Sequence, residues 1–527
     1  MKNIKIIYTL LFGVAVLLFF GWAYPHHLHY QEQFQLFLFD GTYVWDIVKL
    51  PGGMADLLGR FCTQFFLFAW VGAFIIALLL SAVQLLTLRL ASSWTSQATE
   101  SSEGWWYGLS FVPSFLLWLF LLDENALLGG VWAVLLTLLI TWIFDLLPRG
   151  GWMRHILLIA AIPVLYWMVG PVCLVFFLLQ APLLESPSLP HAREKRQREA
   201  WYYGVFVLLA VMLVILSFYL PVPASKLWFG IHYHRYPTEI TVLLWAAALS
   251  VFVLKLLVRV IHRRAKAQTK AKVSRRHIVT LFSFVLVAII MGGLVWKSSN
   301  FKAEKVMKYD FMARYQQWNR ILETINTEKP NNQIGVTVQN LALGMHGLLT
   351  DHLFDYNQNG ILGLLPDVGT DATSPLPTAE AFYQLGMITV AQRTVFEAQE
   401  AILDFQKSAR CYKRLAQTNL ILGSYEVARK YLTALQKTLF YREWANETLP
   451  LLGNEEAIAK HPEYGRLRQF AYDDNFFFGD HVTSDMLLKL FLSNTDNHLA
   501  YEYLKAYYLL TGDRENYTKL LLHSFDQ

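Results

Sequence analysis

The feature that most constrains the fold is a series of long apolar runs in the first part of the chain. These runs cover residues 6–23, 61–88, 105–122, 126–147, 156–169, 171–184, 201–220, 240–261 and 278–296. Roughly 20 apolar residues in a helix cross the hydrocarbon of a bilayer. Backbone polar groups must pair internally in lipid, which makes such segments helical. The sequence therefore predicts an all-α membrane domain over residues 1–296, with about nine crossings by this length criterion.

Composition changes abruptly after Trp296. The chain has 527 residues, of which 55% are hydrophobic and only 16% charged, whereas an ordinary soluble protein has about 25% charged residues. The deficit lies before Trp296, and amphipathic stretches rich in Lys, Glu, Asn and Asp follow it. We therefore expect residues 297–527 to form a separate soluble helical domain.

Two basic segments determine the predicted orientation. They are "HAREKRQREA" at residues 191–200 and "HRRAKAQTKAKVSRR" at 262–276, and Lys and Arg stay on the cytoplasmic side of a membrane. The fifth and sixth apolar runs meet at Gly170 and Pro171, and the alternative of one kinked helix there would carry both basic segments across the membrane. Nine crossings from a cytoplasmic N-terminus avoid this cost. They place residues 297–527 outside the cytoplasm, in the periplasm if the membrane is the inner membrane of a Gram-negative bacterium.

The basic excess and the cysteines exclude several classes of function. The net charge of +5 comes from the two basic segments, which membrane topology explains, so no nucleic acid partner is expected. Cys62, Cys173 and Cys411 have no disulfide or metal-type spacing. The histidines of "PHHLHY", at positions 26, 27 and 29, also lack the spacing of a known ligand set. We predict no metal site, and the sequence identifies no cofactor.

The loop between the first two runs, residues 24–60, combines acids with many aromatic rings. It contains Glu32, Asp40 and Asp46 in "YQEQFQLFLFDGTYVWDIVKLPGG". The pattern predicts a short helix at 32–39, a turn at Asp40, an amphipathic piece at 43–50 and a break at 51–53. Two interpretations are possible. The loop forms a reaction site, or its acids and rings have only a structural role.

The soluble domain shows repeated pairs of helices. In "SARCYKRLAQTNLILGSYEVARKYLTALQKTL" a Gly-Ser turn joins two helical patterns, with the small residues Ala416, Gly423 and Ala428 where packed helices approach closely. The pattern resembles tetratricopeptide repeats, although the period is shorter and the consensus is degenerate. Stacked helix pairs leave a face that usually binds protein, so periplasmic proteins are the expected partners. The alternative is a compact helical cap with no partner.

The architecture resembles the C superfamily of polyprenol-dependent glycosyltransferases. Those enzymes carry an acidic residue on a long first outer loop, some members follow it with a Pro-Gly break, and many end in an outward soluble domain. Here Glu32 precedes Pro51, although no paired acidic signature is present. The resemblance implies a polyprenyl-phosphate sugar as substrate, Glu32 as catalytic base and Asp40 as the second candidate.

A second outer loop, between the apolar runs 201–220 and 240–261, could face the predicted base. This loop, "WFGIHYHRYP", contains His232, His234 and Arg235, which would bind the substrate by supplying charge to the phosphate. The opposing interpretation is that Glu32 solvates an interfacial helix and Asp40 caps a turn, because acids are common on such helices.

At the level of the whole chain, the passages "HYQEQFQLFLFD" and "EYLKAYYLLTGDRENY" resemble an uncharacterised family of multipass proteins from Bacteroidetes-type bacteria. That resemblance implies topology and no catalysis. Two hypotheses about function therefore stay open: a transferase that uses a lipid-linked sugar, and a non-catalytic envelope scaffold. A transporter is disfavoured, because ionisable residues deep in the runs are scarce.

Overall fold

The computed structural model describes residues 2–94, 102–147, 152–181, 192–236, 239–265, 273–367, 369, 371–403, 406–472 and 483–525. Within these ranges the secondary structure is helical and contains no strand, which confirms the expected all-α class. The chain divides into two compact units. Unit 1 comprises Met1–Glu32 and Asp40–Asn300, and unit 2 comprises Gln33–Phe39 and Phe301–Gln527.

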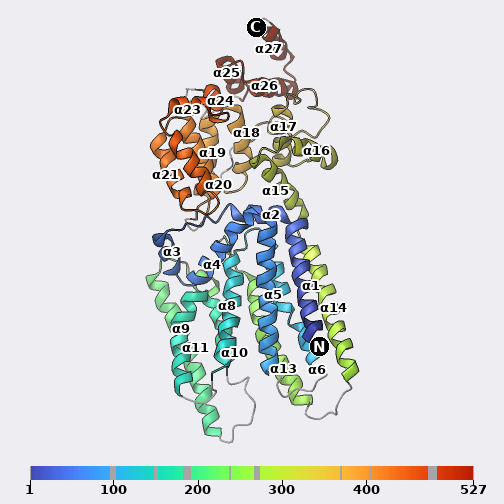
Figure 1. Ribbon diagram of the computed structural model, residues 1–527, viewed down its shortest axis with the longest axis vertical. Helices are drawn as coiled ribbons and strands as arrows, with labels where there is room; N and C mark the ends of the chain where they lie inside the picture. Colours follow the sequence, from blue (N-terminus) through green and yellow to red (C-terminus); the bar gives the residue numbers. More distant parts are fainter. Residues whose placement is uncertain are drawn as a thin grey trace. The chain divides into compact units, whose positions relative to one another are not determined.

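Unit 1 consists of long apolar helices joined by shorter ones (Figure 1). Its elements are α1 (Lys2–Leu18), a π-helical turn (Phe19–Ala23), α2 (Pro25–Glu32), α3 (Gly41–Val48), α4 (Gly53–Thr63), a 3-10 turn (Gln64–Leu67), α5 (Ala69–Trp94), α6 (Ser102–Leu109), α7 (Val112–Phe120), α8 (Leu128–Asp145), α9 (Trp152–Val169), a 3-10 turn (Gly170–Val172), α10 (Cys173–Gln180), α11 (Ala192–Tyr219), α12 (Ala224–Phe229), α13 (Val242–Ala265) and α14 (Val273–Ser298).

Several of these helices can cross a membrane. Among the described residues, five segments are long and apolar enough: Lys5–Ala23, Ala69–Ser93, Leu128–Asp145, Met153–Gln180 and Ile278–Ser298. Shorter apolar helices cover Trp105–Phe120, Tyr203–Tyr219 and Val242–Val258. The chain is a membrane protein by the length and apolar character of these helices, while the number of crossings stays a prediction.

The segment Met153–Gln180 reverses direction in its middle. Arg154, near the start of α9, donates from Nη2 to Oε1 of Gln180, the last residue of α10, at 2.8 Å. Gln180 in turn donates to Oδ1 of Asp145 at the end of α8, at 2.9 Å. The two ends of the segment are therefore close together, and α9 and α10 form a hairpin that turns at Gly170–Val172. Gly170 has φ +67°, and a Cβ atom there would meet the Tyr233 hydroxyl at 2.8 Å.

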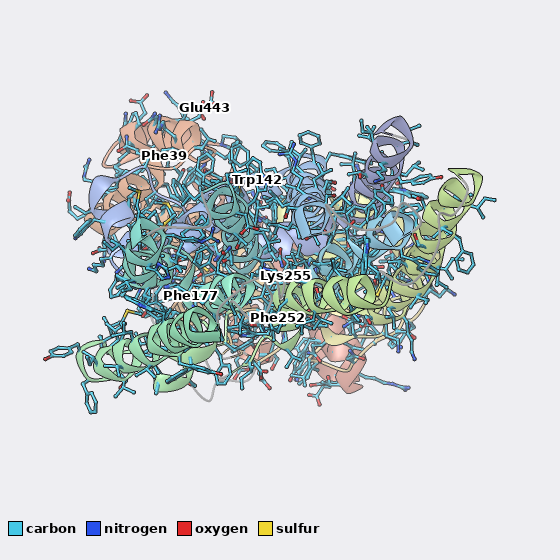
Figure 2. All side chains as sticks on the ribbon, turned by 90° about the horizontal axis from the view of Figure 1, so that it is seen from below. Phe39, Trp142, Phe177, Phe252, Lys255 and Glu443 are labelled. Carbon is cyan, nitrogen blue, oxygen red and sulfur yellow. The ribbon has the colours of Figure 1, made fainter. Side chains whose placement is uncertain are left out.

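The end of α10 also contacts α13. Lys255, one of the few ionisable residues within an apolar run, donates to the backbone carbonyl of Leu179; Figure 2 labels Lys255 on α13 and Phe177 on α10. The polar residues of these runs are thus engaged with neighbouring helices. Polar groups inside a membrane domain are normally paired in this way.

The second apolar run does not begin a membrane helix at residue 61. α4 ends at Thr63, a 3-10 turn follows, and Phe68 has an extended backbone with φ −112° and ψ 101° before α5 begins at Ala69. Farther along α5, Gln84 accepts from Thr9 of α1 at 3.0 Å and donates to Ser110 at 2.9 Å. Hydrogen bonds of this kind hold helices together where the apolar side chains alone do not favour association.

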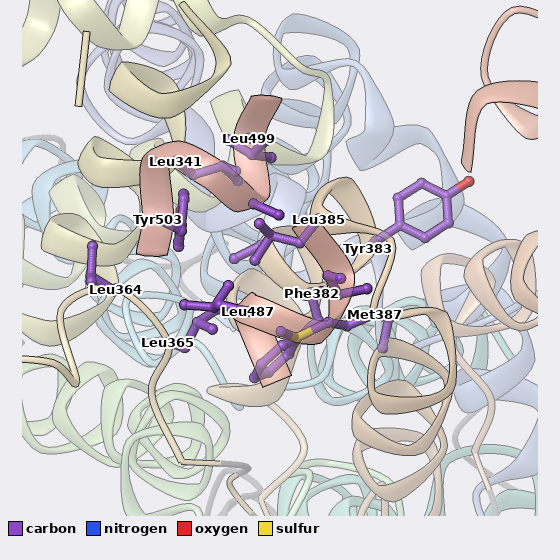
Figure 3. Packing of buried hydrophobic residues seen from close by; sticks show 14 of the residues in the cluster. Leu341, Leu364, Leu365, Phe382, Tyr383, Leu385, Met387, Leu487, Leu499 and Tyr503 are labelled. Atoms are coloured by element: carbon purple, nitrogen blue, oxygen red, sulfur yellow. The ribbon is translucent and has the colours of Figure 1, made fainter. Parts of the chain in front are cut away.

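Unit 2 is built from shorter amphipathic helices. They are α15 (Phe301–Arg314), α16 (Trp318–Glu328), α17 (Gln333–Met345), α18 (Pro375–Leu385), α19 (Ile388–Glu400), α20 (Ala409–Ile421), α21 (Tyr425–Gln436), α22 (Arg442–Thr448), a 3-10 turn (Leu449–Leu451), α23 (Glu455–Lys460), α24 (Tyr464–Phe470), α25 (Thr483–Ser493), α26 (His498–Thr511) and α27 (Arg514–Phe525). Leu341, Phe382, Leu487 and Tyr503 join different helices in its main hydrophobic core (Figure 3).

Helix pairs recur in unit 2 because glycine ends the first helix of each pair. Gly386, Gly423 and Gly512 have φ of 90°, 78° and 71°, a left-handed conformation that favours glycine at helix ends. These residues follow α18, α20 and α26 and precede α19, α21 and α27. Ala416 and Ala428, which the sequence placed at close helix contacts, are fully buried.

The segment Gln33–Phe39, called the strap below, belongs to unit 2 although it lies in the first loop of unit 1. The predicted helix at 32–39 is wrong, because α2 ends at Glu32 and residues 35–40 have no regular secondary structure. Leu36 donates from its backbone N–H to the carbonyl of Lys407 at 2.9 Å, and Phe39 does the same to Lys437 at 2.7 Å. Leu36 is buried in a cluster with Ala409, Ala416, Leu432, Leu435 and Ala445. These contacts outweigh the local helical preference.

Candidate functional site

Helix α2 holds polar side chains against the turn between α7 and α8. Its residue His27 is fully buried and its Nε2 lies 2.9 Å from the carbonyl oxygen of Leu121. Gln31 donates to the carbonyl of Ala126 at 3.2 Å. Burial lowers the pKa of His27 to about 4, although the carbonyl of Leu121 and the charge of Asp123 act in the opposite direction. His27 is therefore neutral near pH 7 and fixes α2 to this turn.

The loop after α12 packs against the same turn. Arg235 donates from its backbone N–H to the carbonyl of Asn125 at 2.9 Å, and Leu127 donates to the carbonyl of Tyr233 at 3.0 Å. The Tyr233 side chain folds back over Gly230, where a Cβ atom would lie 2.0 Å from the ring. Only glycine, here with φ +129°, allows this reversal. The loop thereby delivers its histidines and arginine to the end of unit 1 where α2 lies.

Both ring nitrogens of His234 are engaged. Nε2 lies 3.1 Å from Oδ2 of Asp123, and Nδ1 lies 3.1 Å from the backbone N and 3.3 Å from the carbonyl oxygen of Tyr236. Burial alone would lower the pKa of His234, but the hydrogen bond and charge of Asp123 outweigh it and the pKa is raised. The same pairing lowers the pKa of Asp123 against the opposite effect of burial. His234 therefore orders the loop, and it has no nitrogen left to accept a proton from a substrate.

The structure brings four of the five predicted site residues to this end of unit 1. Glu32, His232, His234 and Arg235 have exposed fractions of 4%, 7%, 9% and 5%. Arg235 donates from Nη1 to the hydroxyl of Tyr30 at 3.4 Å, two positions before Glu32 on α2. The carboxylate predicted as base and the arginine predicted to bind phosphate are therefore carried by elements in direct contact.

Asp40 has a different environment. It is the N-cap of α3, where its side chain accepts from the backbone N–H groups of Thr42 at 3.0 Å and Tyr43 at 3.3 Å. A carboxylate at this position pairs the first amide groups of a helix, which have no partner within it. The structure thus gives Asp40 a capping role, which the sequence analysis held as the alternative.

An ion pair that sequence analysis did not single out lies next to His232. Arg60 donates from Nε and Nη2 to Oδ2 of Asp56, both at 2.9 Å, and Nδ1 of His232 lies 3.6 Å from the same oxygen. Asp56 is only 1% exposed. Burial would raise its pKa, but the charges of Arg60 and His232 outweigh this effect and the pKa is lowered. Asp56 is therefore ionised; it binds the Arg60 guanidinium and lies within ion-pair distance of His232.

A close helix contact makes this arrangement feasible. A Cβ atom at Gly59 of α4 would lie 2.4 Å from the backbone N of Gly129 on α8. A Cβ atom at Gly129 would lie 3.1 Å from the carbonyl oxygen of His232. The paired glycines therefore let α8 approach both α4 and the histidine loop. The sequence "GMADLLGR" could have indicated this ion pair, because Asp56 and Arg60 are four positions apart and therefore share one face of a helix.

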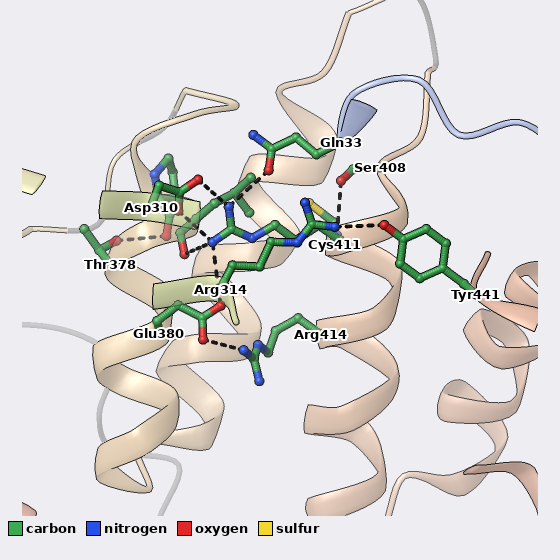
Figure 4. Close-up of polar contacts among 12 residues, drawn as sticks. Gln33, Asp310, Arg314, Thr378, Glu380, Ser408, Cys411, Arg414 and Tyr441 are labelled. Atoms are coloured by element: carbon green, nitrogen blue, oxygen red, sulfur yellow. Dashed lines mark hydrogen bonds and ion pairs between the residues drawn. The ribbon is translucent and has the colours of Figure 1, made fainter. Parts of the chain in front are cut away.

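Unit 2 contains a second group of buried charges, centred on Arg410 of α20. Figure 4 labels Gln33, Asp310, Glu380 and Arg414 of this group. Arg410 donates to both carboxylate oxygens of Asp310, at 2.7 and 2.8 Å, and to Oε1 of Gln33 at 3.0 Å. One turn later, Arg414 pairs with Glu380 at 2.5 Å and lies over the ring of Tyr383, 3.7 Å from its centroid. Two-point Arg–carboxylate bonds are among the stronger polar contacts in proteins. They join α15, α18, α20 and the strap.

Within the described parts of the chain, no group of three or more His, Cys, Asp or Glu side chains could hold a metal ion. The site at the end of unit 1 therefore offers carboxylates, imidazoles and guanidinium groups as its chemistry. These groups can accept a proton and stabilise an anion such as a phosphate.

Comparison with known proteins gives a family and no activity. No curated protein and no solved structure matches the chain. A family model described as "Family of unknown function (DUF6057)" matches residues 2–526, which covers nearly the whole of both units. The expectation of a family without an assigned activity is thereby confirmed. The chain belongs to the family of unknown function DUF6057.

Proposed function

We propose that the chain is a multipass protein of a bacterial inner membrane that transfers a sugar from a polyprenyl-phosphate donor at the outer face. The observation that carries this proposal is the burial of Glu32 at the end of α2, two positions after Tyr30, whose hydroxyl accepts a hydrogen bond from Arg235. Buried ionisable groups are costly, so their concentration at one end of a membrane domain indicates a functional site. The architectural resemblance to the C superfamily of glycosyltransferases supports the choice of reaction.

The proposed reaction assigns a role to each group. Glu32 removes the proton from the acceptor hydroxyl, whose oxygen forms the new bond to the anomeric carbon of the sugar. The bond between that carbon and the phosphate oxygen breaks, and the polyprenyl phosphate leaves with the electron pair. Arg235 and His232 stabilise the negative charge on the leaving phosphate. Asp56, whose Oδ2 lies 3.6 Å from Nδ1 of His232, positions that imidazole.

Orientation is part of the proposal. The hairpin of α9 and α10 supports it, because a reversal at Gly170–Val172 is what keeps both basic segments on the same side as the N-terminus in the nine-crossing topology. Unit 2 then lies in the periplasm. Ser424→Cys in unit 2 should react with a membrane-impermeant maleimide in cells whose outer membrane is permeabilised, whereas Ser92→Cys at the end of α5 should not. Labelling of Ser92→Cys but not of Ser424→Cys would indicate the opposite orientation.

The catalytic role is tested with Glu32→Gln in the full chain. Purified protein is mixed with undecaprenyl-phosphate-linked monosaccharides and an envelope extract as acceptor, and released undecaprenyl phosphate is quantified by mass spectrometry. Glu32→Gln should abolish release while leaving the melting temperature unchanged. The matched control is Asp46→Asn, an exposed carboxylate on α3, which should behave like the parent. Release by Glu32→Gln at the parental rate would remove Glu32 as the base.

The second candidate is a non-catalytic scaffold that binds periplasmic proteins through unit 2. The glycine-terminated helix pairs of unit 2, which are similar to tetratricopeptide repeats, favour it. In that case Glu32→Gln would retain the cellular phenotype of the parent. Substitutions on the surface of unit 2 would remove the phenotype instead.

A further inference from the structure

A cation lies near the end of a membrane-crossing segment in unit 1. Arg89 of α5 is four positions before the end of Ala69–Ser93, and its side chain is exposed. Trp142 of α8, which Figure 2 labels, is three positions before the end of Leu128–Asp145. At a rise of about 1.5 Å per residue, both positions are roughly 4 to 6 Å from the ends of their segments. They therefore lie at the level where a bilayer changes from hydrocarbon to headgroups.

The two side chains contact each other. The Cζ atom of Arg89 lies over the ring of Trp142, 5.2 Å from its centroid, which is within the distance at which an indole ring attracts a cation. Trp142 is half-buried and thereby restrains the exposed guanidinium group. Arg89 makes no side-chain hydrogen bond and no ion pair with any other described residue. The ring thus holds the charge in place, while the N–H groups stay available to a ligand.

Apolar side chains surround this pair on the surface of unit 1. Leu85, one turn before Arg89 on the same face of α5, is 45% exposed, and Ile143 and Leu146 of α8 are 50% and 67% exposed. Exposed apolar side chains on a membrane-crossing helix contact lipid. An arginine near a helix end extends towards the headgroup layer, where the negatively charged group of a phospholipid is its phosphate. The ligand that this surface meets is therefore a lipid phosphate.

This surface is separate from the proposed transferase site. The start of α5 faces α2, since a Cβ atom at Gly72 would lie 3.2 Å from the side chain of Leu28. Arg89 is 17 positions after Gly72, which is about 25 Å along the helix. A ligand of Arg89 therefore takes no part in the transfer of the sugar.

We propose that Arg89 and Trp142 bind the phosphate of an anionic phospholipid such as phosphatidylglycerol. The planar guanidinium group donates to two phosphate oxygens, a geometry that arginine favours. The acyl chains of the lipid lie along the exposed leucine and isoleucine side chains of α5 and α8. A zwitterionic lipid fits less well, because its ammonium group adds a second positive charge beside Arg89. The inference goes beyond the transferase reaction, since it assigns unit 1 a lipid-binding site.

The test is native mass spectrometry of the purified full chain, titrated in detergent with phosphatidylglycerol or with phosphatidylcholine of the same acyl chains. The parent should bind its first phosphatidylglycerol molecule more tightly than phosphatidylcholine. Arg89→Gln should weaken this binding about tenfold, as expected for the loss of a hydrogen bond to a charged group. Trp142→Leu should weaken it about threefold, because the contact between the cation and the ring is the weaker interaction.

The matched control is Arg154→Gln. Arg154 also lies over a ring of α8, with its Cζ atom 4.8 Å from the centroid of Phe144. Its guanidinium group, however, donates to Gln180 and to the carbonyl of Leu147. The variant removes the same positive charge near the same end of α8, so its affinity for phosphatidylglycerol should stay parental.

The proposal is wrong if Arg89→Gln binds phosphatidylglycerol as tightly as the parent does. It is also wrong if Arg154→Gln loses as much affinity as Arg89→Gln, or if phosphatidylcholine binds the parent equally well. Displacement of the lipid by inorganic phosphate would assign the site to a free anion instead. If Arg89→Gln fails to fold, Arg89→Lys replaces it and should also weaken binding, since lysine keeps the charge and lacks the planar group.

Discussion

Arg410 donates a hydrogen bond to Gln33 at 3.0 Å across 377 positions of sequence. The same guanidinium group binds Asp310 of α15, so one side chain connects the first loop of the chain with two helices of unit 2. The strap is therefore part of the structure of unit 2. Two interpretations of the acidic and aromatic loop were open, a reaction site and a structural role. The structural role applies to Gln33–Phe39. Glu32, which directly precedes the strap, stays the candidate base.

Truncation of Leu36 should loosen unit 2. Leu36→Ala removes a buried side chain from a packed cluster, and such changes cost about 2 to 5 kcal/mol. The readout is the alkylation rate of Cys411, which is fully buried on α20, followed by mass spectrometry on the intact chain. The rate should rise in Leu36→Ala and stay parental in Trp45→Ala, whose side chain is 67% exposed on α3. Equal rates in both variants would contradict the role of the strap.

Replacing Arg410 should lower the free energy of unfolding of unit 2 more than replacing Gln33 does. Arg410→Met leaves Asp310 and Glu380 without their shared partner, and breaking a buried ion pair costs about 3 to 5 kcal/mol. Gln33→Leu removes one hydrogen bond to a charged group, about 1.5 to 3 kcal/mol. The two variants are compared by urea unfolding, monitored through the same Cys411 alkylation. A larger effect of Gln33→Leu would show that the strap acts mainly through another contact.

The contact between α4 and α8 should not tolerate an added methyl group. Gly59→Ala would place a Cβ atom 2.4 Å from the backbone of Gly129, and backbone cannot move aside as a flexible side chain can. We expect a lower melting temperature and a lower yield of folded protein. Gly204→Ala on α11 is the control, because its Cβ atom would meet nothing within 4 Å. Similar melting temperatures for both variants would refute the close contact.

The pairing of His234 with Asp123 should make stability depend on pH. The pKa of His234 is raised above its ordinary value of 6.5, so the folded chain binds this proton more tightly than the unfolded chain does. The stabilisation is complete below pH 6.5 and is lost as the pH rises through the raised pKa. The pKa of Asp123 is lowered from 3.8, so its contribution is complete above that value and is lost at lower pH.

The measurement is the melting temperature of the parent and of Asp123→Asn between pH 5 and pH 9. The melting temperature of the parent should fall across the upper part of this range as His234 loses its proton. Asp123→Asn lacks the paired charge and should show a smaller decrease. Parallel curves for the two proteins would exclude the pair as the source of the pH dependence.

Much of the architecture follows from local sequence, whereas the site depends on contacts between distant segments. Gly170 and Pro171 mark the turn between α9 and α10 because these residues interrupt an apolar run. The strap was predicted as a helix, although the polar and apolar residues of its first half alternate with the period of an extended chain. Its conformation is decided by Lys407 and Lys437, which no local pattern could indicate.

Within the site, Glu32, His232 and Arg235 were identified as types of residue suited to phosphate chemistry. The contact of Arg235 with Tyr30 depends on how the loop after α12 folds back. The ion pair of Asp56 and Arg60 was visible as a spacing of four on one helix, but its significance needed the crossing of α4 with α8. Sequence therefore located the polar segments and missed the residues that position them.

The strap also has a consequence for biosynthesis. Residues 33–39 leave the ribosome early, but the carbonyl groups of Lys407 and Lys437 that receive them are translated at least 370 residues later, a delay of tens of seconds at roughly 5 to 20 residues per second. During that interval the amide groups of Leu36 and Phe39 lack the carbonyl partners that they have in the folded chain. Unit 2 can complete its folding only when residues 33–39 bind to helices that are synthesised much later. A segment translated early is therefore needed to finish the domain that is translated last.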